Sequence, residues 1–485
     1  MMSDILLMIL YALFSFSLLL YGLNCLLMIY ASNKYKSVDI KEGISNYPYV
    51  TVQLPIYNER YVVHRLIEAV CSLDWPKDKL QILVLDDSTD DTSQLIDKEV
   101  EAQRRRGIDI SVIRRERRTG FKAGALQNAL KFTRGKYIAV FDADFIPPRD
   151  FLKRTVPILE EDATLGFIQA RWGHINRNYN LLTKTIAIGI DGHHIIEQAG
   201  RNALGFFINF NGSCGILRTK AIMDVGGWSW DTLSEDLDIS YRMQMKGWRG
   251  LYLRDLVVPG EIPPNMPAFR NQQARWARGS IQCARKLLPS ILFSPFPILK
   301  KIQATIHLTY YMVHLFMLSQ LLIIVPLTYF KINPLLKHMT PLFGLYFICA
   351  ISPSLMYYEA IKYQKISFKE MLPYLGLLAI IGYGLSVQCS IELIKGLIHY
   401  GGDFERTPKY DIKNDHDKWS DKRYKPLRRT TFLEYILSIY SLIGVLLSLR
   451  SNLIVLSFYL CVYFLSYLYM GLCTDLHYRR IYNYN

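Results

Sequence analysis

Hydrophobic residues in this chain are gathered into a few long runs rather than spread evenly along it. Residues 5–33 contain no charged side chain. That run is longer than the roughly 20 residues needed to cross a bilayer as a helix. The chain starts Met-Met-Ser-Asp and offers no small-residue cleavage site, which argues against a signal peptide. We therefore interpret residues 1–33 as an uncleaved transmembrane helix.

Residues 34–303 show a different pattern, typical of a water-exposed domain. Charges occur every few residues, and short apolar runs alternate with segments of helical spacing. One such segment, 61–73, predicts a helix. Strands are predicted at 50–54, 80–85, 108–113 and 136–141. Because strands that alternate with helices are typical of parallel sheets, we expect one large α/β domain here.

Long apolar runs return after residue 304. They occupy residues 304–330, 339–358, 371–390, 435–449 and 451–474. One globular core holds one such run rather than five, so we expect a membrane. Residues 304–400 would form transmembrane and interface helices, and 430–485 a transmembrane hairpin with a tail. Residues 371–400 become amphipathic towards their end, which favours a place in or near the membrane interface.

Basic residues indicate how the chain would be oriented. The sequence has 57 Lys and Arg against 42 Asp and Glu, a formal charge of +15. Lys34 follows the first apolar run, and Lys300 and Lys301 precede the second. The positive-inside rule then places residues 34–303 and the charged loop 401–429 in the cytosol, within a multi-pass integral membrane protein. The charge is not accompanied by a zinc finger or a basic-aromatic RNA motif, so we expect a lipid bilayer rather than nucleic acid as partner.

An acidic pair follows the predicted strand that ends near residue 141. Asp142 and Asp144 are separated by one alanine. In parallel sheets, ligands bind beyond the carboxyl ends of the strands. Two carboxylates at that place are suited to Mg²⁺ or Mn²⁺, with phosphate oxygens completing the shell. Taken alone, the same residues also fit a solvated acidic turn.

Two other strand ends carry polar residues. Glu59 ends the segment Pro-Ile-Tyr-Asn-Glu, and Asp86 and Asp87 precede Ser and Thr. The second cluster fits either a helix N-cap or a contact to a base or ribose. Lys122 lies among small residues before a helical pattern, where it is either a diphosphate contact or an ordinary surface lysine. Neither GxxxxGK[ST] nor GxGxxG occurs, so the P-loop and dinucleotide fingerprints are missing.

Two further motifs contain residues that could take part in catalysis or substrate binding. Glu235 and Asp236 follow Ser234, and they either cap a helix or supply a general base for a hydroxyl acceptor. Gln272, Arg275 and Trp276 have the spacing i, i+3 and i+4, which places them on one face of a helix. Gln and Arg would hold a departing diphosphate and Trp would stack on a sugar. The alternative is an interface helix with a Trp anchor.

In this order the motifs resemble the inverting membrane glycosyltransferases of family two. The pattern D, DxD, (T/S)ED and QxxRW matches residues 86–87, 142–144, 234–236 and 272–276. The segment Val-Gln-Leu-Pro-Ile-Tyr-Asn-Glu is similar to the cellulose-synthase-like glucomannan mannosyltransferases and xyloglucan glucan synthases. The resemblance implies an α/β nucleotide-diphospho-sugar transferase domain of GT-A type. That domain would lie between an N-terminal transmembrane helix and a C-terminal α-helical transmembrane bundle.

The resemblance also implies roles for individual residues. Glu59 would belong to the substrate site, Asp86 or Asp87 would bind the base, and Lys122 the diphosphate. Asp142 would approach the ribose and, with Asp144, hold the metal. Asp236 would be the base, with Glu235 beside it, and Gln272, Arg275 and Trp276 would close on diphosphate and acceptor.

Two loops are similar to loops of the same family. Asn211 lies in Phe-Asn-Gly-Ser, which resembles an acceptor-end loop that has Cys at this position in cellulose synthases. Residues 404–409 look like the FxVTxK gating loop that covers the nucleotide, with Thr407 and Lys409 matching and Arg406 where Val is usual. An extra cation there suits a nearby diphosphate.

The sequence thus predicts an inverting hexosyltransferase. The donor would be UDP-glucose or GDP-mannose, the cofactor Mg²⁺ or Mn²⁺, and the product a β-linked glucan or mannan exported through the helices. A single transfer to a lipid, as in ceramide glucosyltransferase-like enzymes, is one alternative, and a channel or receptor with a nucleotide-sensing domain is another. The polysaccharide-forming enzyme could act as a homo-oligomer or with an accessory subunit.

Overall fold

A seven-stranded sheet forms the centre of the domain predicted over residues 34–303. The computed structural model describes residues 2–38, 46–329, 340–403, 405–412, 416–422, 424 and 431–482. The strands are β1 (Val50–Ile56), β2 (Leu80–Asp86), β3 (Ile110–Arg114), β4 (Tyr137–Val140), β5 (Leu165–His174), β6 (Gly215–Arg218) and β7 (Arg249–Gly260). Their order in the sheet is β3-β2-β1-β4-β6-β5-β7. The four predicted strands are confirmed, each within a few residues of its expected bounds.

The parallel arrangement predicted for the four sequence-predicted strands is confirmed, and the sheet also contains one antiparallel strand that the sequence did not indicate. β1 to β4 are parallel to one another, and so are β5 and β7, but β6 runs antiparallel to both β4 and β5. The reason is that the chain reaches β6 from the edge where the parallel strands end. The loop that precedes β6, with Asn211, therefore lies at the same edge as the polar strand ends of β1, β2 and β4.

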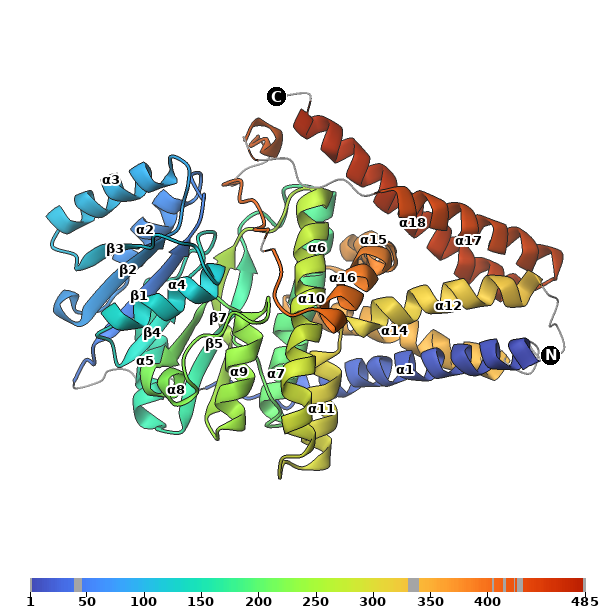
Figure 1. Cartoon of the computed structure of the whole chain (residues 1–485), viewed down its shortest axis with the longest axis horizontal. Coiled ribbons are helices and arrows are strands. Elements are labelled where there is room, and N and C mark those ends of the chain that lie inside the picture. The colour runs from blue at the N-terminus through green and yellow to red at the C-terminus, as the bar shows by residue number, and fades with distance from the viewer. Residues whose placement is uncertain are drawn as a thin grey trace.

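Helices cover both faces of this sheet (Figure 1). They are α2 (Val63–Cys71), α3 (Thr92–Arg105), α4 (Phe121–Ala129), α5 (Phe151–Glu161), α6 (Leu181–Asp191), α7 (Gln198–Ala203), α8 (Thr219–Asp224) and α9 (Glu235–Met245). Short 3₁₀ turns lie at Lys77–Lys79 and Leu130–Phe132, and a π-helical turn at Gly192–Glu197 joins α6 to α7. The middle of β1 and β2 is fully buried, as expected for parallel strands covered on both faces.

Long helices form the second half of the molecule. They are α1 (Met2–Ser32), α10 (Met266–Leu292), α11 (Ile298–Leu308), α12 (Met312–Tyr329), α14 (Thr340–Tyr363), α15 (Phe368–Gly384), α16 (Ser386–Ile398), α17 (Phe432–Arg450) and α18 (Ile454–Tyr482). A 3₁₀ turn lies at Trp419–Asp421. α1, α12, α14, α17 and α18 extend to the side away from the sheet (Figure 1).

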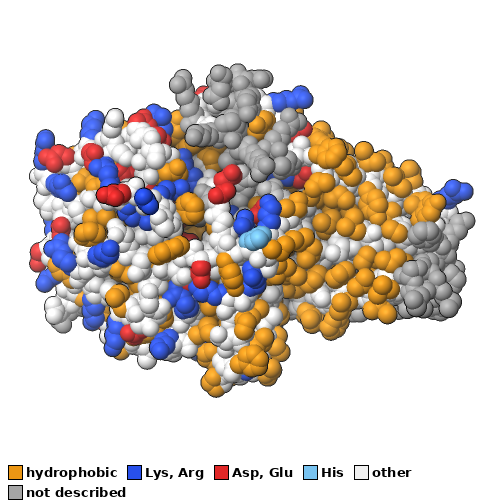
Figure 2. Space-filling view, in the orientation of Figure 1, with side chains coloured by type: hydrophobic (Ala, Val, Ile, Leu, Met, Phe, Trp, Pro, Cys, Tyr) orange, Lys and Arg blue, Asp and Glu red, His pale blue; other side chains and the backbone are white. Residues whose placement is uncertain are grey.

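Surface chemistry separates these two halves. Hydrophobic side chains cover the long helices, whereas Lys, Arg, Asp and Glu gather over the sheet domain (Figure 2). Four helices of the described chain are long and apolar enough to cross a membrane: Leu6–Ser32, Met312–Tyr329, Phe432–Arg450 and Ile454–Arg480. The apolar run 304–330 is divided, because its first residues belong to α11. α15 (Phe368–Gly384) and α16 (Ser386–Ile398) meet at a bend of 43°, so the segment predicted at residues 371–400 lies in a broken span or a re-entrant element.

Candidate functional site

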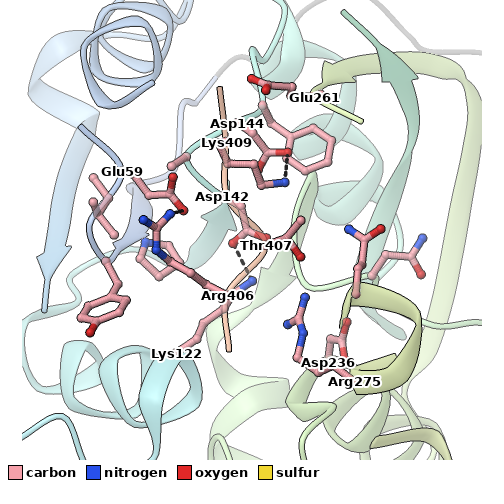
Figure 3. A pocket seen from close by; sticks show the side chains of 18 of the residues that line it. Glu59, Lys122, Asp142, Asp144, Asp236, Glu261, Arg275, Arg406, Thr407 and Lys409 are labelled. Carbon is pink, nitrogen blue, oxygen red and sulfur yellow. Dashed lines mark hydrogen bonds and ion pairs between the residues drawn. The ribbon is translucent and has the colours of Figure 1, made fainter. Parts of the chain in front are cut away.

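The polar strand ends, the loop before β6 and two later segments line one pocket of about 180 Å³. Its wall includes most of the residues predicted from the sequence: Glu59, Asp87, Lys122, Asp142, Asp144, Asn211, Glu235, Asp236, Gln272, Arg275, Trp276, Thr407 and Lys409. In Figure 3, Glu59 and Arg406 lie at one end of this pocket and Asp236 and Arg275 at the other, with Lys122 and Asp142 between them. Elements separated by hundreds of residues therefore build a single site.

Lys122 occupies the middle of the site. Its Nζ donates to Asp142 Oδ1 at 2.5 Å and to the carbonyl oxygen of Gly212 at 2.9 Å, and it lies 3.8 Å from Glu235 Oε1. Burial lowers the pKa of this ammonium, but the carboxylates of Asp142 and Glu235 raise it, and the net shift is upwards. The ammonium of Lys122 thus stays charged, as the predicted contact to a diphosphate requires.

Glu235 and Asp236 begin α9 at the opposite end of the pocket. Burial raises the pKa of both carboxyls, and their mutual repulsion adds to the effect on Glu235, while Lys122 opposes it. A carboxylate with a raised pKa is a stronger base than an exposed aspartate. Asp236 lines the pocket beside Arg275, where a general base would face an acceptor hydroxyl.

The QxxRW residues enter from α10. Asn265 caps this helix, since its side chain accepts a hydrogen bond from the amide of Ala268 at 3.0 Å. Gln272, Arg275 and Trp276 all line the pocket, which confirms the predicted shared face. Burial lowers the pKa of Arg275, and Glu235 and Asp236 counter this shift.

Residues 405–412 lie across the pocket. Thr407 is buried, Lys409 Nζ lies 2.7 Å from Asp144 Oδ2, and Arg406 Nη1 lies 3.0 Å from Glu59 Oε1. Burial raises the pKa of Glu59 to about 8 despite Arg406 and Lys409. Arg406, expected beside a diphosphate, lines the pocket and pairs with Glu59 at the end of β1. Phe404, the first residue of the predicted gating motif, lies outside the described residues.

Asp86 and Asp87 are separated by the pleat of β2. Asp87 lines the pocket, where Arg115 holds its Oδ1 at 3.0 Å. Asp86 points away and is fully buried, bonded to Ser93 Oγ at 2.8 Å and Arg114 Nε at 2.9 Å. Successive strand side chains face opposite sides, so only one of this pair reaches the ligand side. Of the two alternatives for the base contact, Asp87 is the one in the pocket.

Two glycines permit the close approach of these segments. Gly212 has φ +79°, and a Cβ there would lie 3.0 Å from Asp236 Oδ2 and 3.3 Å from Lys122 Nζ. Gly279 of α10 packs directly against Ser234: a Cβ would lie 2.1 Å from its Oγ and 3.0 Å from its backbone nitrogen. α10 therefore sets the position of the turn that carries Glu235 and Asp236.

We expect Gly279→Ala to reduce sugar transfer by roughly 10–100-fold while nucleotide binding changes little. The added methyl group displaces Ser234, and a shift of about 1 Å in a reacting group has effects of this size. Gly376→Ala in α15 is the matched control, since a Cβ at Gly376 meets nothing within 4 Å. Initial rates and thermal midpoints of both variants in detergent check this. Full transfer by Gly279→Ala would contradict the role assigned to this contact.

The pocket also contains residues that sequence reasoning missed. Glu261 follows β7 and accepts hydrogen bonds from the backbone amides of Tyr410 at 2.6 Å and Asp411 at 2.9 Å, which anchors the covering loop. The rule that found Asp142, an acid just beyond a strand, would have found Glu261. Tyr57 and Arg118 also line the pocket, and no motif marked Arg118.

The donor set at the end of β4 fits a divalent cation. Asp142 and Asp144 supply hard oxygen ligands, and each now pairs with a lysine. Within the described ranges no group of three or more His, Cys, Asp and Glu side chains is arranged to hold a metal. Magnesium sites of nucleotide enzymes use one or two carboxylates and take the remaining ligands from phosphate and water. Two aspartates are enough for such a site.

Comparison with known proteins identifies the class of this domain. Residues 137–361 match the family described as glycosyl transferase family group 2. This match confirms the predicted resemblance and, for the matched region, the predicted enzyme class of a glycosyltransferase.

Two plant relatives indicate which group within the family the chain is similar to. Glucomannan 4-beta-mannosyltransferase 2 of Arabidopsis thaliana is 43% identical over 258 residues, 52% of this chain and 48% of the relative. Glucomannan 4-beta-mannosyltransferase 1 of Oryza sativa subsp. japonica is 40% identical over 258 residues, with 52% and 50% covered. The matched region thus spans about half the length of these relatives. The predicted similarity to the cellulose-synthase-like mannan synthases is confirmed over that region.

A solved structure supports the fold. The mannosyltransferase PcManGT from Pyrobaculum calidifontis, in complex with GDP-Man and Mn²⁺, has a TM-score of 0.52 and 18% identity. The match covers 79% of this chain and 99% of that one. At this identity the likeness concerns the fold alone.

Proposed function

We propose that this protein transfers a hexose, with inversion, from a cytosolic nucleotide-diphospho-sugar to a growing β-linked polysaccharide of the glucan or mannan type. The observation that carries the proposal is the convergence of Lys122, Asp142, Asp236 and Arg275 in one pocket. Direct displacement at a sugar carbon requires cations that hold the diphosphate and a carboxylate that takes a proton, and this pocket contains both.

The proposed reaction uses residues of the chain as follows. Asp236 takes the proton of an acceptor hydroxyl, and the hydroxyl oxygen attacks the anomeric carbon of the donor. The bond between that carbon and the diphosphate oxygen breaks on the opposite side, so the configuration inverts. Lys122 and Arg275 hold the negative charge that develops on the leaving diphosphate. Mg²⁺ or Mn²⁺ held by Asp142 and Asp144 would supply further neutralisation of that charge.

The donor class is supported by similarity. The plant relatives are named as mannosyltransferases, and the Pyrobaculum calidifontis structure contains GDP-Man and Mn²⁺. GDP-mannose is therefore the first donor to test and UDP-glucose the second. The loop with Arg406, Thr407 and Lys409 would close over either nucleotide.

A chamber of about 450 Å³ extends from the site into the helical bundle. It shares Asn211, Asp236 and Trp276 with the first pocket, so an acceptor in the chamber would meet the base and the Trp plane. Tyrosines and histidines from α11 to α14 line it further along. These side chains suit a saccharide, and we infer that the chamber receives the acceptor end of the polymer.

A second acceptor class is favoured by the apolar part of the same chamber. Leu18 of α1, Met356 of α14 and Leu378 of α15 line it and would accommodate an acyl chain. A single transfer to a lipid hydroxyl is thus the alternative function. Both proposals place the protein in a bilayer, with the sheet domain on the cytosolic side.

The test is a donor panel followed by product sizing. Purified protein in lipid nanodiscs is incubated with GDP-mannose, UDP-glucose and UDP-N-acetylglucosamine, each with Mg²⁺ or Mn²⁺. The proposal predicts a β-linked product of many sugars from one donor. A product of one sugar on lipid would replace the polysaccharide proposal by the alternative, and absence of nucleotide release with every donor would overturn both.

A further inference from the structure

We propose that Arg118 reads the nucleobase of the donor and selects guanine over uracil, an inference that rests on the proposed nucleotide-sugar site. None of the sequence motifs includes this residue. It lies in the turn that precedes α4, four positions before Lys122, and its side chain lines the same pocket.

Arg118 lies at the end of the pocket where the base belongs. The diphosphate position is marked by Lys122, and the acceptor end by Asp236 and Arg275. The charged and polar groups that act on Arg118 are instead Tyr57, Asp87, Arg115 and Arg406, and Arg406 lies with Glu59 at the opposite end (Figure 3). A nucleoside that is attached to the diphosphate and directed away from the acceptor would therefore lie at this end of the pocket.

The guanidinium of Arg118 is held in place by aromatic rings, but its Nε has no hydrogen-bond partner among the described residues. Its Cζ lies 3.4 Å from the centroid of the Tyr57 ring and 4.9 Å from that of Phe121, which fixes its plane. Its Nε is buried, and among the described residues no acceptor lies within hydrogen-bonding distance of it. Burial also lowers the pKa of this group. A buried donor without a partner in a ligand pocket requires an explanation, and a bound acceptor supplies one.

Asp87, whose charge acts on Arg118, does not supply that acceptor. Its carboxylate is held through both oxygens by Arg115. Arg115 is in turn fixed by the carbonyl oxygens of Thr119 at 2.8 Å and Phe121 at 3.0 Å. Asp87 and Arg115 therefore form a closed pair, and Arg118 is left as the donor that faces the ligand.

Guanine matches this donor better than uracil does. Guanine presents two adjacent acceptors, O6 and N7, on one edge, and an arginine fork bonds both at once. Uracil has a carbonyl flanked by a C–H group or an N–H donor, so it offers the fork one acceptor. Bidentate contacts of this type discriminate by roughly 10–100-fold.

The test measures nucleotide binding rather than transfer. Full-length protein in nanodiscs with Mn²⁺ is titrated calorimetrically with GDP, 7-deaza-GDP and UDP. We expect GDP to bind about 10–100-fold more tightly than the other two. Arg118→Gln should remove this preference and leave 7-deaza-GDP and UDP affinities nearly unchanged. Arg118→Lys keeps the charge but loses the fork, and should lose the preference as well.

Arg117→Gln is the matched control, since Arg117 is the exposed neighbour of Arg118. It should retain the wild-type order of affinities. Equal losses of GDP and UDP binding in Arg118→Gln would assign Arg118 to the phosphates, and tighter binding of UDP than GDP by the wild type would exclude guanine. Both results overturn the inference and leave the proposed function standing. Failure of all three nucleotides to bind would overturn the proposed function together with the inference.

Discussion

Asp236→Asn is expected to lower the transfer rate by about 10²–10⁴-fold, the usual contribution of a general base. The amide keeps the shape of the carboxylate but cannot accept the acceptor's proton. Nucleotide binding should stay the same or become slightly tighter, because a negative charge near Lys122 and the diphosphate is removed. Single-turnover transfer and calorimetric nucleotide binding measure the two effects separately.

Asp231→Asn provides the control for this substitution. Asp231 is an exposed carboxylate in the loop that precedes α9, paired with Lys286 at 2.8 Å and absent from the pocket wall. Its variant should transfer sugar at the wild-type rate. Wild-type turnover by Asp236→Asn would refute the assignment of the base, and it is also the result expected of a nucleotide-sensing channel or receptor.

The same carboxylate gives the pH profile a predictable acidic limb. Burial raises the pKa of Asp236 above its ordinary value, and the base is active only when deprotonated. The rate should therefore fall as the pH decreases through that raised pKa, at a higher pH than an exposed aspartate would produce. In Asp236→Asn this limb should disappear from the residual rate.

Asp144→Asn is expected to raise the Mn²⁺ concentration required for transfer and for nucleotide binding by at least about 10-fold. Asp144 is buried at the end of β4, and its carboxylate faces Lys409 at 2.7 Å in the pocket. An amide keeps one oxygen ligand but removes the charge that holds a divalent cation. Titration of Mn²⁺ at fixed nucleotide, read by calorimetry, gives the shift.

Asp150→Asn is the control for the metal prediction. Asp150 follows the same strand but is exposed and lies outside the pocket. It should leave the Mn²⁺ dependence unchanged. If Asp144→Asn titrates like the wild type, or if chelation of divalent ions leaves nucleotide binding and transfer intact, the metal assignment is wrong.

Much of the architecture was predictable because its signals are local. The strands β1, β2 and β4 are short and mostly apolar, and such segments are buried in a sheet that helices cover on both faces. The first apolar run became one helix, Met2–Ser32, for the same reason. The run 304–330 was divided between α11 and α12, since hydropathy indicates apolar character but not where a helix ends.

The candidate site was predictable only in part. Asp142, Asp144 and the QxxRW residues were found because each follows a strand or shares a helix face. Whether Asp86 or Asp87 faces the pocket depends on the pleat at the end of β2. A shift of the strand by one residue would exchange the faces of the two side chains. Arg118 was missed because a single arginine in a charged segment carries no signal until Tyr57 is placed beneath it.

The sequence by itself determined the three-part layout, an α/β domain between apolar segments, and the acids and bases available to the site. These follow from local hydropathy and from motifs a few residues long. Only the tertiary structure decided that β6 is antiparallel, that Lys409 reaches Asp144 across 265 positions of chain and that Asp236 opens into a chamber of the helical bundle. Such contacts depend on the packing of distant elements, and local sequence carries no record of which surfaces will meet.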